Sequence, residues 1–346
     1  MQSEACRQLG FWTLALCYYA RQDPAALLDP DGDQVVDGFV APLVEQLRTA
    51  GVLGDYSWMR YAEGGFHLRC QFRAGSEDQA RRQLACIADQ FEQVKQTRPA
   101  LFSGGQQLSP IARALNQRAG ICQLHPPGTL QSGPVHDSGE QHVYDHATGY
   151  LHVMRGQTHW SDIALQALAT TTTYDQRLQV AIPVVLALLV QYGSNAAERS
   201  SQALFIAATW RQHFGIDGTP ADPGAAALWQ RRLPIQALLD AVHVAPLHAV
   251  AWLPSTLQPA ASAALAWGAN GVAALAPERP ALRAMQVLSL VHQVANRLGI
   301  SLIDETALCE LVHRHLTATA ALPLASIQAD VATWTDYWSR PHVDAA

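Results

Sequence analysis

Hydrophobic residues follow two different spacings along this chain, and the balance between them changes near residue 160. The first part alternates short apolar runs, typical of strands, with segments whose apolar residues recur every three or four positions, typical of helices. From Ser161 onward the helical spacing dominates. We therefore predict an α+β fold in which a ferredoxin-like β-α-β-β-α sheet unit, residues 1–160, precedes a mainly helical part, residues 161–346, in one compact protein.

The elements of the first part follow from this pattern. The apolar run Phe11–Tyr19 predicts a buried strand, and Val36–Ala50 has helical spacing with a stop at Gly51. Ser76 is expected to cap a second helix, because acidic residues follow it in the first turn. The remaining segments are a Gly-, Pro-, Ser- and Gln-rich connector, a short helix within it, and a later strand and turn: Leu101–Gly139, Pro110–Gln117 and Gln141–Tyr150.

The second part is predicted to consist of helices. Ser161 or Asp162 is expected to cap the first of them, and Pro183 should split or kink a long apolar stretch. The Ala-rich stretch Leu253–Pro277 contains Pro and Gly breaks, so its helicity stays open. The further predicted helices are Glu198–Phe214, Ala225–Val242, Ala281–Leu298 and Asp304–Thr317, the last capped by Asp304.

One segment combines an apolar and a polar face in an unusual way. Trp58–Phe72 is predicted to be a β-hairpin, because Gly64 and Gly65 permit the positive φ of a tight turn. A period of two places Phe66, Leu68, Cys70 and Phe72 on one face of the second strand, and His67, Arg69, Gln71 and Arg73 on the other. This polar row is suited to binding a peptide, a carboxylate or a carbonyl, and the alternative is a solvated sheet face.

Composition narrows the class of protein. Hydrophobic residues make up 49% of the 346 residues and charged residues 15%, as in globular proteins, and the net charge of −6 argues against general nucleic-acid binding. The apolar run Ala181–Val190 is too short to span a membrane, and no signal peptide is recognisable. The six cysteines are scattered, so we expect no zinc site, no disulfide framework and a soluble, cytoplasmic protein.

Candidate chemistry rests on histidines. The chain has no nucleotide-binding or serine-hydrolase motif, which argues against an ATP-driven step and against a serine hydrolase. His292 and Asn296 lie four residues apart on a predicted amphipathic helix, so both side chains can face one site, with Arg297 beside them. A core histidine bonded to a backbone carbonyl is the alternative. Five further histidines crowd one stretch, where an exposed loop is expected rather than a metal site: His136, His142, His146, His152 and His159.

Two segments carry a family resemblance. Arg60-Tyr61, followed after five residues by His67-Leu68-Arg69, resembles the Arg-Tyr-x-x-x-x-x-His-Leu-Arg signature of the SpaB C-terminal, or thiopeptide-type bacteriocin biosynthesis, domain. His292 with Asn296-Arg297-Leu298 is similar to the family's His-x-x-x-Asn-Arg-Leu helix. This domain is the elimination half of class I lantibiotic dehydratases. It also occurs alone, as split elimination enzymes and as the pyridine-forming cyclases of thiopeptide pathways.

The chain departs from the elimination enzymes at two points. The resemblance implies that hairpin arginines, an arginine in a Tyr-x-x-Glu-x-x-Arg-Tyr-Gly segment and the helix histidine serve glutamate elimination. Here Gln71 replaces the second hairpin arginine, and Val143–Tyr150 lacks the glutamate and arginine of the other segment. A departing glutamate anion is best bound by bidentate guanidinium groups, so the loss of two such groups favours a cyclase.

The resemblance therefore implies a stand-alone enzyme of thiopeptide-type biosynthesis that acts on a dehydrated precursor peptide. It would join two dehydroalanines by a formal 4+2 aza-cycloaddition and then release water and the leader peptide, with no redox cofactor or metal and no membrane or nucleic-acid partner. Positioning of the reacting groups alone is worth about 7–11 kcal/mol. Arg69, His67, His292 and Tyr61 are the candidate catalytic residues, and Arg60, Gln71, Asn296 and Arg297 the candidate substrate-binding residues.

Two other functions stay open at this stage. One is a lyase of the same fold that eliminates glutamate from glutamylated Ser or Thr with a rearranged set of arginines. The other is a non-catalytic partner that binds the precursor peptide and escorts it to other pathway enzymes.

Overall fold

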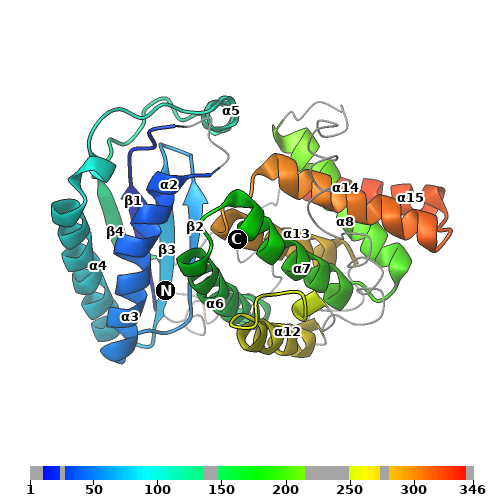
Figure 1. Cartoon of the computed structure of the whole chain (residues 1–346), viewed down its shortest axis with the longest axis horizontal. Coiled ribbons are helices and arrows are strands. Elements are labelled where there is room, and N and C mark those ends of the chain that lie inside the picture. Colours follow the sequence, from blue (N-terminus) through cyan, green and yellow to red (C-terminus); the bar gives the residue numbers. More distant parts are fainter. Residues whose placement is uncertain (1–10, 24–27, 136–146, 215–248, 273–279, 340–346) are drawn as a thin grey trace, which may run out of the picture. The chain divides into compact units, whose positions relative to one another are not determined.

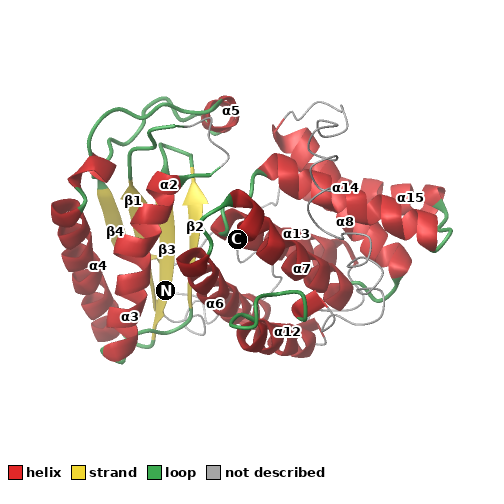
Figure 2. Ribbon diagram, in the orientation of Figure 1, coloured by secondary structure: helices red, strands yellow, loops and turns green. Residues whose placement is uncertain are grey.

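The computed structural model describes residues 11–23, 28–135, 147–214, 249–272 and 280–339. The chain divides into two compact units. The sheet unit comprises Met1–Gly139 with Ala164–Thr170, and the helical unit comprises Glu140–Ile163 with Thr171–Ala346. We describe each unit by itself. Within the described ranges, the strands belong to the first unit, and the second is built from helices (Figure 2).

The sheet unit contains four antiparallel strands in the order β2-β3-β1-β4. Their bounds are β1, Phe11–Tyr18; β2, Tyr56–Tyr61; β3, His67–Ala74; and β4, Leu130–Val135. The helices are α2, Pro30–Val35; α3, Ala41–Thr49, joined to α2 by a π-helical turn at Val36–Val40; α4, Glu77–Thr97; and α5, Pro110–Arg118, with a 3-10 turn at Pro99–Phe102 before it. Helices α3 and α4 pack against each other, and α4 packs against the sheet (Figure 1).

The expected alternation along the second hairpin strand is confirmed. Leu68, Cys70 and Phe72 are fully buried on the face that forms the core, and the polar side chains of His67, Arg69 and Gln71 occupy the other face of β3. The hairpin itself is also confirmed, because β2 and β3 pair antiparallel around a turn in which Gly64 and Gly65 have φ of 73° and 118°.

A buried glutamine connects helix α4 to the sheet. The Gln83 side chain donates to the carbonyl oxygens of Val52 and Arg73, at 2.8 and 3.0 Å, and accepts the Thr13 hydroxyl at 2.9 Å. All its hydrogen-bonding groups thus meet partners in the core, where unpaired polar groups are costly. The predicted N-cap of this helix is also confirmed, because Ser76 accepts a hydrogen bond from the Gln79 amide.

The helical unit contains seven described helices. They are α6, Ala147–Thr170, whose last turns group with the sheet unit; α7, Tyr174–Tyr192; α8, Ala196–Phe214; α12, Gln258–Val272; α13, Pro280–Arg297; α14, Leu302–Thr319; and α15, Leu324–Ser339. Helix α8 packs against α14 and α15, and α13 packs against α7. The predicted helices at 198–214 and 281–298 are confirmed, and 225–242 lies outside the described residues.

Several predicted elements are wrong in place or extent. A strand and turn were expected at Gln141–Tyr150, but Tyr150 lies in α6, and residues 141–146 lie outside the described ranges. The fourth strand of the sheet is instead β4, which lies within the segment predicted to be a connector. Strand β4 contains Gly133 and Pro134 and is an edge strand, where a proline is tolerated because one side needs no amide donor. Ser161 and Asp162 lie inside α6 and cap nothing.

Three further corrections concern helix ends and breaks. The helix expected from Val36 begins at Pro30, where Asp29 accepts a hydrogen bond from the Gly32 amide. Helix α7 continues through Pro183, so the predicted split is wrong, and the alternative of a kink stays a prediction. The cap of α14 is Ser301, whose hydroxyl accepts from the Asp304 amide, rather than Asp304. The start of a helix is thus decided by which side chain reaches the free amides, and spacing alone does not reveal it.

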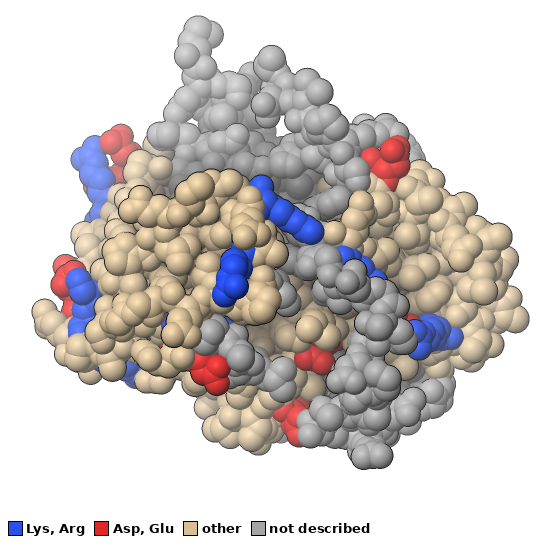
Figure 3. All heavy atoms as spheres, turned by 90° about the horizontal axis from the view of Figure 1, so that it is seen from above, with Lys and Arg blue, Asp and Glu red and all other residues tan. Residues whose placement is uncertain are grey.

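The described cysteines are free thiols. Cys17 and Cys70 are buried in the sheet and Cys309 in the helical unit, and burial raises the pKa of all three thiols; Cys122 is exposed. Among the described helices, none has the length and apolar character required to cross a bilayer. Acidic and basic side chains are scattered over the face shown in Figure 3 and do not form a large patch of one sign.

Candidate active site

The polar face of the hairpin presents rows of side chains set by strand register. His67 pairs with Tyr61 on β2 and with Tyr18 on β1, so these three side chains share one face of the sheet. The next row along the strands contains Arg69, flanked by Met59 and Leu16. The predicted catalytic residues Tyr61, His67 and Arg69 are therefore neighbours.

His67 is a buried imidazole held in a defined orientation. Its ring lies 4.6 Å from the Tyr18 ring and 5.5 Å from the Tyr61 ring, and its Nδ1 is 2.9 Å from the Gly65 carbonyl oxygen. Because a carbonyl oxygen only accepts, Nδ1 carries the proton and Nε2 has the free lone pair. Burial lowers the pKa of His67 to about 4, and the nearby Arg69 and His125 add to this effect. At neutral pH, His67 is therefore uncharged, and its Nε2 is a hydrogen-bond acceptor.

Arg69 is the cation of this face. Its guanidinium lies 5.6 Å from the centre of the Tyr61 ring, and no carboxylate within the described residues forms an ion pair with it. Arg73, two residues on, is instead paired with Asp55 at 3.1 Å. Between them, Gln71 is buried and supplies a neutral amide. The polar row thus offers one available guanidinium, a neutral imidazole and a neutral carboxamide.

Tyr18 and His125 belong to this face but were not predicted from the sequence. The Tyr18 ring contacts that of His67 on one side, and its centre lies 4.7 Å from the centre of the His125 ring. The side-chain nitrogen of Gln131 lies 3.2 Å from the ring nitrogens of His125. The register of β1 with β3 would have indicated Tyr18, because the two strands pair antiparallel. His125 lies in the Gly- and Pro-rich connector, where no periodic signal marks a site residue.

The connector also holds the hairpin turn in place. The Gly64 amide donates to the Asn116 side chain at 2.7 Å, the Phe66 amide donates to Gln106 at 2.9 Å, and the His125 amide donates to the Gly64 carbonyl at 2.7 Å. The φ of 118° at Gly65 favours glycine, and a Cβ there would lie 2.4 Å from the amide end of the Gln106 side chain, which would have to move. These hydrogen bonds fix the position of the turn, which includes the Gly65 carbonyl that accepts from His67.

Arg60 lies on the other face of the hairpin from Arg69. Its guanidinium is 2.6 Å from Asp33 and 3.7 Å from Asp29, and Tyr19 also hydrogen-bonds Asp29. The alternation of β2 places Arg60 with Trp58 and away from Tyr61. These ion pairs favour a structural role in joining β2 to the start of α2. Its predicted contact with substrate stays a prediction.

His292 belongs to a hydrogen-bonded group in the helical unit. Its Nδ1 lies 3.0 Å from one carboxylate oxygen of Glu305, and the Trp210 indole N–H donates to the other at 2.7 Å. The Glu305 side chain is 1% exposed and that of His292 is 22% exposed. Asn296 is half-buried one turn along α13, and Arg297 is fully buried. The partner of His292 is thus a carboxylate and not a backbone carbonyl.

A family comparison matches the chain across both units. The model of the family described as lantibiotic biosynthesis dehydratase C-term matches residues 27–316. The chain belongs to this family. The match includes the hairpin and α13, and the resemblance stated from the two motifs is therefore confirmed. No curated protein matches the chain in a sequence search.

Three solved structures share the fold of this chain. A pyridine synthase, TbtD, from thiomuracin biosynthesis aligns with a TM-score of 0.59 at 13% identity over 89% of this chain and 98% of its own. TsrL aligns with a TM-score of 0.55 at 16% identity over 96% of this chain and 99% of its own. The tRNA-dependent lantibiotic dehydratase MibB from Microbispora sp. 107891 aligns with a TM-score of 0.55 at 18% identity over 90% of this chain and 28% of its own. At these identities the likeness establishes the fold.

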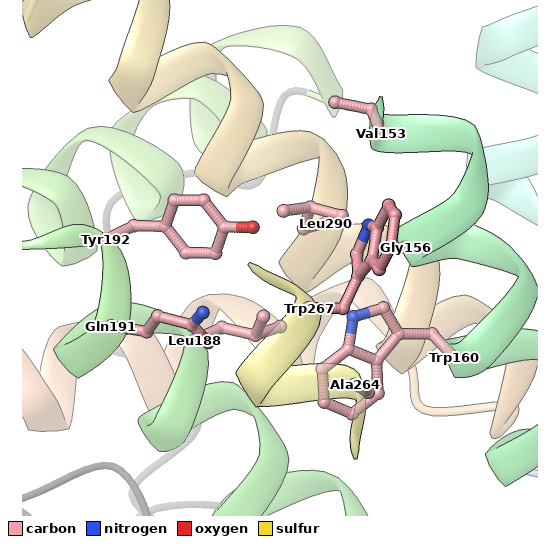
Figure 4. Close-up of a pocket in the computed structure, with 9 residues that line it drawn as sticks. All are labelled: Val153, Gly156, Trp160, Leu188, Gln191, Tyr192, Ala264, Trp267 and Leu290. Carbon is pink, nitrogen blue, oxygen red and sulfur yellow. The ribbon is translucent and has the colours of Figure 1, made fainter. Parts of the chain in front are cut away.

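A small cavity lies between helices of the helical unit (Figure 4). Its lining includes Trp160, Gln191, Tyr192 and Trp267, from α6, α7 and α12. Its volume of about 10 Å³ is the lower limit for one water molecule, so it cannot hold a residue of a peptide substrate.

Of the five crowded histidines, His136, His142 and His146 lie outside the described residues, and the His159 ring is 6.1 Å from that of Trp267. Within the described ranges, no group of three His, Cys, Asp or Glu side chains is arranged to hold a metal ion. We expected His292 to line one cavity with His67 and Arg69. Because these residues belong to different units, this stays a prediction.

Proposed function

We propose that this member of the family is a pyridine-forming cyclase that acts on a dehydrated precursor peptide in the cytoplasm. Two dehydroalanines of one peptide are joined by a formal 4+2 aza-cycloaddition. Loss of water and of the leader peptide then yields an aromatic, pyridine-centred macrocycle. At the level of the fold, we interpret the sheet order β2-β3-β1-β4 as a ferredoxin-like sandwich.

The charge of the hairpin face carries this proposal. Elimination of glutamate needs a site for a carboxylate leaving group, and paired guanidinium groups bind carboxylates best. The face offers Arg69 alone, because Arg73 is paired with Asp55, Gln71 is neutral and the pKa of His67 is lowered to about 4 by burial. Neutral hydrogen-bonding groups with one cation suit the amides and alkenes of a dehydrated peptide.

The residues then divide into hydrogen-bonding groups, proton donors and peptide-binding groups. Arg69 and Gln71 bind amide oxygens of the substrate, and the free Nε2 of His67 accepts a hydrogen bond that orients an amide or iminol. Tyr61 and His292 are the proposed proton donors to the departing hydroxyl and leader amide. Asn296 and Arg297 bind the peptide, and recognition of the leader supplies remote binding energy for orientation.

The proposal is tested by incubating the protein with a dehydrated precursor peptide and following the products by mass spectrometry. Loss of water and the leader fragment, together with a macrocycle, is the expected result. Release of glutamate from a glutamylated precursor without loss of the leader would instead identify the lyase. Binding of the peptide with no change of mass would identify a non-catalytic partner, and either of these outcomes would refute the cyclase.

The substitution Gln71→Arg separates cyclase from lyase within the same site. It restores the second hairpin arginine of the elimination enzymes beside Arg69. For a cyclase, the added charge impairs ring formation and leaves glutamate release undetectable. A gain in glutamate release by this variant would show that the natural chain is a lyase with an incomplete anion site.

A further inference from the structure

The carboxylate of Glu305 stands out among the buried charges of the helical unit. It is 1% exposed and forms no ion pair with Lys or Arg among the described residues, although buried carboxylates usually require such partners. Its two oxygens are instead occupied by the Trp210 indole N–H, at 2.7 Å, and the His292 ring, at 3.0 Å. The three residues come from α14, α8 and α13.

The chemistry of these groups determines which atom of His292 is available. An indole N–H only donates, so one oxygen of Glu305 is an acceptor and is fixed in place by Trp210. As a carboxylate, Glu305 also accepts from the imidazole, which places the His292 proton on Nδ1. The Nε2 atom is then left to exchange protons at a side chain that is 22% exposed.

We propose that Glu305 is the positioning residue of His292, and that Trp210 clamps Glu305 for this task. Glu305 holds the imidazole in one orientation, with the proton on Nδ1 and Nε2 available for substrate. The inference deepens the proposed function and rests on it for the identity of the substrate, but the hydrogen-bond arrangement stands without it.

A second histidine of the helical unit provides a comparison with a structural role. His313 lies on α14, like Glu305, and its Nδ1 is 2.8 Å from the hydroxyl of Ser200 on α8. The partner of this histidine is an uncharged hydroxyl, and the hydrogen bond joins two packed helices. Glu305 differs because its second oxygen is separately clamped by Trp210, so the imidazole contact is made by a charge with a fixed position.

The test compares Glu305→Gln with Glu310→Gln. Glu310 lies on the same helix and forms ion pairs with Arg211, next to Trp210 in the chain, and with Arg314 on its own helix. Its loss therefore breaks a comparable contact between α8 and α14. We expect Glu305→Gln to lower kcat on the dehydrated precursor by about 10²-fold, because general acid–base groups contribute about 10²–10⁴-fold, while KM stays within about twofold. Glu310→Gln should leave kcat within about threefold, and Glu305→Asp should restore part of the loss.

NMR spectra of isotope-labelled histidine rings provide a readout that does not depend on activity. In the unmodified protein His292 should show the proton on Nδ1, and Glu305→Gln should shift this population while the His313 signals stay unchanged. Trp210→Phe removes the indole N–H with less effect on packing, and we expect it to reproduce the tautomer change in part if Glu305→Gln does not fold.

The outcomes separate this inference from the proposed function. An unchanged His292 tautomer in both the Glu305→Gln and Trp210→Phe variants, or equal losses of kcat in Glu305→Gln and Glu310→Gln, would overturn the role of Glu305. If the protein releases glutamate and forms no macrocycle, the proposed function fails. Glu305 is then tested by the same variants on glutamate release.

Discussion

His67 is a histidine whose charge is determined by its surroundings. Burial lowers its pKa to about 4, whereas an unfolded histidine titrates near 6.5. As the pH falls below about 6.5, the unfolded chain takes up a proton that the folded chain does not bind until about pH 4. We therefore expect the free energy of unfolding to decrease across this interval, with a contribution from His67 of about 3 kcal/mol at pH 4.

Urea titrations of the unmodified protein and of His67→Gln, at pH 7.5, 6 and 5, measure this contribution. The two proteins should converge in stability as the pH falls, because the variant lacks the titrating group. A constant difference between them at all three values would show that folding does not change the pKa of His67.

Arg69→Ala tests the other polar residue of this row. The guanidinium is available to stabilise charge that develops on an amide or a departing oxygen, so its loss should affect kcat more than KM. We expect a decrease in kcat of about 10²–10³-fold, as for removal of one donor to a developing oxyanion. Arg73→Ala is the matched control on the same strand, because Arg73 is engaged with Asp55. Loss of leader affinity without loss of kcat would contradict this role for Arg69.

Individual site residues were predictable where the regular period of a strand or helix determines which side chains share a face. The alternation of β3 placed His67, Arg69 and Gln71 on one face, and the i to i+4 spacing placed His292 and Asn296 on one helix. Glu305 and His125 were not predictable, because their positions depend on how separate segments pack. No local spacing relates Glu305 on α14 to His292 on α13.

Among the elements of the sheet unit, α4 is joined to the sheet by hydrogen bonds of one buried side chain as well as by apolar packing. Gln83 satisfies two backbone carbonyls and the Thr13 hydroxyl in the core. Gln83→Leu removes all three hydrogen bonds, although the Val52 carbonyl still accepts from Gln79 and the Thr13 hydroxyl still donates to the Phe72 carbonyl. Each hydrogen bond lost typically costs about 0.5–1.5 kcal/mol, and more where a buried group is left without a partner. We expect a loss of at least about 2 kcal/mol in the free energy of unfolding, measured by urea titration.

Gln93→Leu is the control for this change, because Gln93 is exposed on the same helix. It should alter stability by less than about 0.5 kcal/mol. Similar effects of the two substitutions would mean that the polar contacts of Gln83 contribute little.

Elements were predictable where their side chains alone produce the pattern. Phe11–Tyr18, the hairpin strands and α4 have clear periods, and all were expected. Strand β4 was not, because Gly133 and Pro134 disfavour a strand, and pairing with β1 overrides that local preference. The early start of α6 was missed because Ser161, a favoured cap residue, is instead fully buried within the helix.

For the whole molecule, we predict that Arg69 and His292 act on one peptide. Their motifs both fall within the matched family region, although the residues belong to different units. A dehydrated precursor that carries a photoreactive group next to the reacting residues should label both β3 and α13, as identified by mass spectrometry of the digested protein.

An excess of unlabelled precursor should abolish both labels together. Labelling confined to one unit would indicate that the two motifs serve separate functions.

The buried thiols allow each unit to report its own opening in solution. Cys17 and Cys70 in the sheet and Cys309 in the helical unit are inaccessible and hard to deprotonate, whereas Cys122 is exposed. A thiol reagent should therefore modify Cys122 at once and the buried thiols at the rates at which their own units unfold locally. A bound precursor peptide that stabilises one unit would slow only that unit's modification, so labelling rates can show which half of the protein holds the peptide without any change to its sequence.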